Sequence, residues 1–139
     1  MSSIVIALPK IEDARKIRSV LERHGFAVAS VCSTASNALS SASELGSGVL
    51  ICGHRLPDMN YLDLAECMPR DFEMLLLASA RVICEVPPSI LLVEMPMKAS
   101  DLVNTVSMIL MQQERKRRRE KKSQSFVLKK SRIIYLMQK

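Results

Sequence analysis

Several features are scarce or missing in the sequence, and each absence excludes a class of protein. The 139 residues include no tryptophan, and aromatic residues make up only 4%. No run of about 18 apolar residues occurs, which argues against a membrane-spanning helix. The N-terminal stretch MSSIVIALPK has no basic region ahead of a long apolar one, which argues against a signal peptide. Because hydrophobic residues still make up 48%, we expect one domain with an aliphatic core.

The four cysteines show no metal-binding or disulfide pattern. Cys32, Cys52, Cys67 and Cys84 are scattered, without a CxxC pair. Zinc sites and disulfide frameworks depend on close, regular spacing. We therefore expect reduced thiols in a cytoplasmic protein, with no metal and no other cofactor.

Charge divides the chain into two parts. Residues 1–110 carry 9 Lys and Arg against 12 Asp and Glu, a net charge of −3, whereas residues 111–139 carry 11 against 2, a net charge of +9. We predict a globular domain of nearly balanced charge over residues 1–112 and a basic helical segment over residues 113–139.

Short apolar runs alternate with helical patterns along the first part. The predicted strands cover residues 3–8, 26–32, 48–53, 73–79 and 89–95. Amphipathic or small-residue segments between them predict helices, except between residues 80 and 88, where only a turn fits around Pro87 and Pro88. This alternation predicts an α/β fold, a doubly wound five-stranded parallel sheet with an extended C-terminal helix.

Ligands of such sheets bind beyond the carboxyl ends of the strands. The loops there contain LPK, CGHRLPDM, LLLAS and VEMPM, and the first helix ends in LERHGF. With these pieces, residues 3–112 resemble the receiver domain of bacterial response regulators, which has a flavodoxin-like fold.

The resemblance implies a phosphorylation site, but its key side chains are replaced here. The family uses an acid pair for Mg²⁺, an aspartate nucleophile, a switch hydroxyl and a lysine. The corresponding positions hold Leu8 and Pro9, Gly53, Ser79 or Ala78, and Met95. Without a carboxylate, a metal site or a cation, phosphoryl transfer has no means of charge neutralisation. We therefore expect a degenerate receiver with no catalytic residues, not an enzyme, and no small-molecule substrate.

The second part contains a dense run of cations. Seven of the eight residues from 115 to 122 are basic, namely Arg115, Lys116, Arg117, Arg118, Arg119, Lys121 and Lys122. Such a run is either a solvated helical spacer or a contact to nucleic-acid phosphates. We expect the helix to be interrupted or capped at Ser123-Gln124-Ser125.

The end of the chain, SFVLKKSRIIYLMQK, is similar to the start of the RNA-binding module of ANTAR-type antitermination regulators. Leu136-Met137 matches the pattern of that module, whereas Arg132-Ile133 departs from it. The resemblance implies a phosphorylation-independent regulator that binds RNA through the basic run. The alternative is a scaffold for protein contacts or homodimerisation. Ile83, Val86 and Ile90 would then form a dimer seam, unless they only close over the core.

Overall fold

The computed structural model describes residues 3–83, 85–95 and 98–137, and for residues 117 and 120–137 it describes the backbone only. Its centre is a sheet of five parallel strands in the order β2-β1-β3-β4-β5. The strands are β1 (Ser3–Ala7), β2 (Val28–Cys32), β3 (Ser47–Gly53), β4 (Asp71–Ser79) and β5 (Leu91–Met95). The predicted parallel α/β sheet is therefore confirmed.

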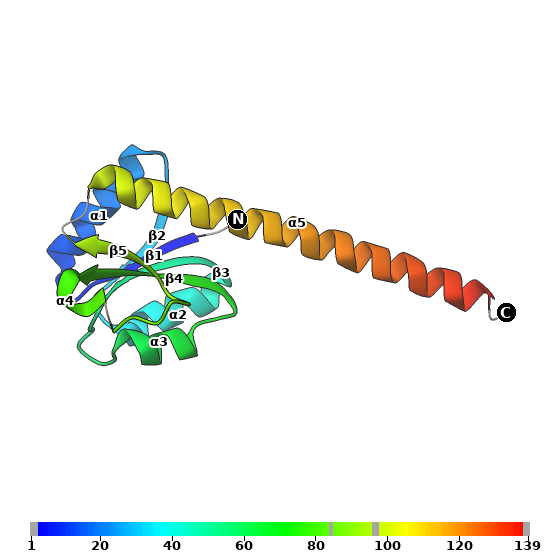
Figure 1. Ribbon diagram of the computed structural model, residues 1–139, viewed down its shortest axis with the longest axis horizontal. Coiled ribbons are helices and arrows are strands. Elements are labelled where there is room, and N and C mark those ends of the chain that lie inside the picture. The colour runs from blue at the N-terminus through cyan, green and yellow to red at the C-terminus, as the bar shows by residue number, and fades with distance from the viewer. Residues whose placement is uncertain (1–2, 84, 96–97, 138–139) are drawn as a thin grey trace.

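Helices cover both faces of the sheet (Figure 1). Apolar residues of α1 (Ile11–Arg23) and α5 (Ala99–Met137) pack on one face, and those of α2 (Ala35–Leu45) and α3 (Tyr61–Cys67) pack on the other. The helix α4 (Ala80–Ile83) is a single turn between β4 and β5, as the short connection predicts. Among the described residues, no helix is long and apolar enough to cross a membrane.

The central strand β3 is buried on both faces of the sheet. Leu50 and Cys52 belong to the cluster under α2 and α3, whereas Val49 and Ile51 belong to the cluster under α1 and α5. All four are fully buried. A strand that is buried on both faces reads as a continuous apolar run, which is why VLIC carries no polar residue.

The start of β3 needs a glycine. Gly48 has a φ of 151°, and a Cβ added there would lie 1.9 Å from the backbone oxygen of Ser3 on β1. Any larger residue would push β1 away.

Three strands begin two residues away from their predicted starts. The strand β2 begins at Val28 and not at Phe26, because the N–H of Phe26 donates to the carbonyl of Leu21 at the end of α1 (3.0 Å). The strand β5 begins at Leu91 and not at Ser89, because Ile90 donates to the carbonyl of Pro87 in a turn (3.1 Å). The strand β4 begins at Asp71, two residues before the predicted start, since Asp71 pairs with Ser47.

The predicted interruption of the last helix was wrong. Helix α5 continues through residues 123–125 to Met137. Serine and glutamine cost only a few tenths of a kcal/mol each in a helix interior, and no glycine or proline follows Ala99 to break it. One helix therefore crosses the predicted domain boundary at residue 112.

Ile83, Val86 and Ile90 pack against the core. All three are partly buried against the cluster that lies under α2 and α3. Of the two alternatives, closure over the core therefore describes these side chains better than an exposed dimer seam.

Candidate functional site

The carboxyl edge of the sheet is filled by hydrocarbon at the place where the resemblance would put a nucleophile. A Cβ added to Gly53, at the end of β3, would lie 3.2 Å from Cδ2 of Leu8 and 3.6 Å from Cδ of Pro9. The side chain of Leu8 is held in place, since it is only 7% exposed and its N–H donates to the carbonyl of Cys32 (3.1 Å). A side chain at position 53 would therefore pack tightly against Leu8 and be in van der Waals contact with Pro9.

The other two predicted positions lie next to each other. Ser79 at the end of β4 pairs in register with Met95 at the end of β5. Both are exposed, whereas Ala78 is buried in the core. Of the two candidate positions, Ser79 is thus the exposed one, and its neighbour in register is a thioether instead of a cation.

Metal-binding groups do not gather at this edge in the described part of the chain. Glu12 and Asp13 are exposed in the first turn of α1. Across the described residues, no group of three or more His, Cys, Asp or Glu is placed to hold a metal ion.

An aspartate in the loop after β3 links that loop to helix α2. The carboxylate of Asp58 accepts hydrogen bonds from the N–H of Ala35 (2.8 Å), the N–H of Ser36 (3.0 Å) and the hydroxyl of Ser36 (2.8 Å). These bonds, led by the one from Ala35, lower the pKa of Asp58 below its ordinary value. Asp58 therefore satisfies N–H groups that the start of a helix leaves free, beside the N-cap Thr34.

Other reactive side chains near this edge are buried or packed against a neighbour. Burial raises the pKa of the Cys52 thiol to about 12, which keeps it protonated at neutral pH. The ring of His54 packs against Tyr61, with 5.4 Å between ring centroids. Cys32 is a buried free thiol and Cys67 an exposed one.

Helix α5 is fixed to the opposite edge of the sheet by Gln113. Its side-chain Nε2 donates to the carbonyl of Gly48 (2.7 Å) at the start of β3 and more weakly to that of Asp71 (3.5 Å) at the start of β4. Leu102, Val106 and Ile109 lie fully buried on the preceding turns. Beyond Gln113 the helix extends away from the sheet (Figure 1).

The predicted basic residues lie on this extension. Arg115, Lys116, Arg118 and Arg119 are exposed. The side chains of Arg117, Lys121 and Lys122 lie outside the described part of the structure. Arg118 forms an exposed ion pair with Glu114, with 3.5 Å between Nη2 and Oε1. The structure therefore gathers at least four of the predicted cations on one solvated stretch of helix.

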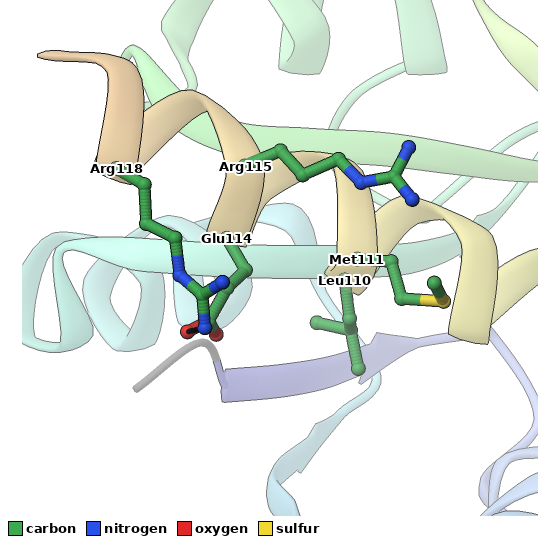
Figure 2. Close-up of a pocket in the computed structure, with 5 residues that line it drawn as sticks. All are labelled: Leu110, Met111, Glu114, Arg115 and Arg118. Atoms are coloured by element: carbon green, nitrogen blue, oxygen red, sulfur yellow. Dashed lines mark ion pairs between the residues drawn. The ribbon is translucent and has the colours of Figure 1, made fainter.

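A groove of about 480 Å³ lies where α5 leaves the sheet (Figure 2). Leu110, Met111, Glu114, Arg115 and Arg118 line it. Sequence reasoning missed this groove, the link through Asp58 and the anchor at Gln113. A signal for the anchor was present, since Gln113 is a polar residue at an inward position of the helix, following Val106 and Ile109.

The similarity of this chain to known proteins is seen in the structure and not in the sequence. No protein-family model matches the sequence, and no curated protein does either. A CheY-like response regulator receiver domain from Methanospirillum hungatei has a TM-score of 0.69 at 12% identity, over 82% of this chain and 98% of the other. A response regulator receiver domain from Clostridium thermocellum has a TM-score of 0.70 at 16% identity, over 82% and 98%.

A third structure gives the same result. The signal receiver domain of an HD domain-containing protein from Pseudomonas fluorescens has a TM-score of 0.73 at 16% identity, over 85% of this chain and 93% of the other. At such identities the likeness concerns the fold alone. With the strand order β2-β1-β3-β4-β5, it shows that this chain has the CheY-like fold of response regulator receiver domains.

Proposed function

We propose that this chain is a regulator of receiver fold that works without phosphorylation and without enzymatic activity. The observation that supports this proposal is the surroundings of Gly53: position 53 has no carboxylate, and a Cβ there would lie in tight contact (3.2 Å) with Leu8, next to Pro9. A receiver that cannot form an aspartyl phosphate can still act through association, because a partner that prefers one conformation shifts the equilibrium.

We further propose that the output is RNA binding in the manner of ANTAR-type antitermination regulators. The exposed cations Arg115, Lys116, Arg118 and Arg119 support this output, because they are presented on a helix that extends beyond the sheet. Each contact between a cation and a phosphate releases counterions, which gives affinity with little sequence specificity. No aromatic residue lies between positions 115 and 122 to add base stacking.

The test of RNA binding compares two variants with the same loss of charge. In the first, Arg115, Arg117, Arg118 and Arg119 are replaced by glutamine. In the second, the exposed cations Lys10, Arg15, Lys16 and Arg23 are replaced in the same way. We expect the first variant alone to lose about tenfold or more in affinity for a labelled stem-loop RNA library at physiological salt, with a shallower dependence of affinity on salt.

The same experiment distinguishes RNA binding from the alternative function, a scaffold for protein contacts. Equal losses in both variants would mean that only net charge matters, and no binding by the unaltered chain would remove the RNA output. The alternative function, a scaffold for protein contacts, would then stand alone. Its support is the apolar part of the groove on α5, which phosphates do not need.

Independence from phosphorylation is tested with beryllofluoride and Mg²⁺. A ligand that binds only the folded state stabilises it by about 2.7 kcal/mol at a concentration a hundredfold above its Kd, and this stabilisation raises the melting temperature. We expect no change in melting temperature for the unaltered chain or for Gly53→Asp, because the acid pair and the lysine are missing as well. An increase in the unaltered chain would contradict the proposal, and an increase in Gly53→Asp alone would mean that the missing carboxylate is the one group that prevents phosphorylation.

A further inference from the structure

The groove on α5 has an apolar floor. Leu110 is partly buried and packs against the core cluster under α1 and α5. Met111 is 57% exposed, and Met108 one turn earlier is 45% exposed. These methionines are the two most exposed large apolar side chains in the described part of the chain. Exposed apolar area at one place marks a candidate contact surface.

The rim of the groove is cationic. Arg118 pairs with Glu114, but the pair is largely exposed, at 74% and 65%, and therefore weak. Arg115 is exposed and forms no ion pair with any residue whose side chain the structure describes. Figure 2 shows the Arg118 and Glu114 side chains together on one side of the groove and Arg115 extending along the helix. The groove thus offers at least one guanidinium that is free for a carboxylate.

The orientation of the groove is fixed before any partner binds. The hydrogen bond from Gln113 to Gly48 and the buried Val106 and Ile109 hold one side of α5 against the sheet. At 100° per residue, Met111 and Arg118 then lie on the opposite side, toward solvent. A surface that is already ordered loses little entropy on binding.

The apolar part of the groove fits a protein segment. A phosphate backbone can bind the exposed cations, but it gains nothing from covering Leu110 and Met111. An amphipathic helix buries aliphatic side chains and can place carboxylates one turn away from them. Methionine suits such a contact, because its flexible thioether adapts to different apolar side chains.

We propose that this groove binds an acidic amphipathic helix of a partner protein. Aliphatic side chains of that helix cover Leu110 and Met111, while its carboxylates bind Arg115 and compete with Glu114 for Arg118. The groove runs from residue 110 to residue 118, about 12 Å along the axis, which matches roughly two turns of the partner helix. This inference goes beyond the proposed RNA output, because it depends on Met111 and not on charge alone.

The test begins with a library of displayed random peptides selected on the full chain. We expect enriched peptides that are rich in Asp and Glu and carry aliphatic residues at i, i+3 or i+4. The affinity of the strongest peptide is then measured by fluorescence anisotropy. Met111→Ser should weaken it about tenfold, as for a central contact residue. Glu114→Gln should strengthen it about threefold, because Arg118 becomes free.

Leu62→Ser is the matched control, since Leu62 is an exposed apolar residue (42%) on α3, which packs on the face of the sheet opposite to α5. It should leave peptide affinity unchanged. Failure to enrich acidic amphipathic peptides, or equal affinity of the Met111→Ser variant, would overturn the proposal. Met111→Ser keeps every charge, so RNA affinity should not change, and a loss of peptide binding alone separates this inference from the RNA output.

Discussion

The carboxyl edge of the sheet and the face of α5 beyond the sheet differ in what they offer a ligand. At the edge, Leu8 is 7% exposed and closes over Gly53 with Pro9. On α5, Met111 is 57% exposed beside Arg115 and Arg118. The resemblance to receiver domains implies a phosphorylation site at the carboxyl edge. Here Leu8 covers the part of the edge around Gly53, whereas Ser79 and Met95 stay exposed; the more exposed apolar side chain, Met111, lies on the helix beside exposed cations.

The largest expected effect comes from opening the closed edge. Leu8→Asp would place a carboxylate in a buried apolar position without a cation nearby, and should cost about 3 kcal/mol or more of unfolding free energy. Denaturation by urea measures it. A cost below about 1 kcal/mol would mean that Leu8 does not close the edge as described.

The anchor between the two regions should contribute less. Gln113→Ala removes the hydrogen bond to the carbonyl of Gly48 and leaves that carbonyl without its side-chain partner. We expect a loss of about 1 kcal/mol in urea denaturation. The exposed Gln112→Ala is the neighbouring control and should have almost no effect. Equal effects of the two substitutions would contradict the role of Gln113.

Replacing Asp58 should have a smaller effect on stability, and this effect should depend on pH. Its pKa is lowered in the folded state, so its contribution to stability is complete above the unfolded pKa of about 4. The contribution is lost as the pH falls through the folded pKa. Asp58→Asn should therefore lower the melting temperature at neutral pH, and the difference should shrink below about pH 4. A difference that is independent of pH would count against the carboxylate.

The smallest effect is expected on the open face. Met111→Ser should change unfolding free energy by no more than about 0.5 kcal/mol, because the side chain is exposed. Ile109→Ala, two residues earlier but buried, should cost about 2 to 4 kcal/mol. Similar costs in urea denaturation would mean that α5 is rotated differently on the sheet.

The sequence was sufficient to predict the strands and the residues at their carboxyl ends. Apolar runs such as VLIC predicted buried strands, and the resemblance to receiver domains placed Leu8, Pro9 and Gly53 at the same edge of the sheet. The connection between Asp58 and the start of α2 could not be predicted, because hydrophobic periodicity carries no information on contacts between residues so far apart in the chain. The groove was missed for a related reason, since the outward direction of Met111 depends on how Gln113 meets the edge of the sheet.

The anchor at Gln113 also makes α5 a lever. The helix continues for 24 residues from Gln113 to Met137, which is about 36 Å of rise. A tilt of only about 5° at the anchor would therefore displace the far end by about 3 Å, roughly the length of a hydrogen bond. A partner that binds near residues 110–118 could in this way change the position of the end of the helix without any rearrangement inside the domain.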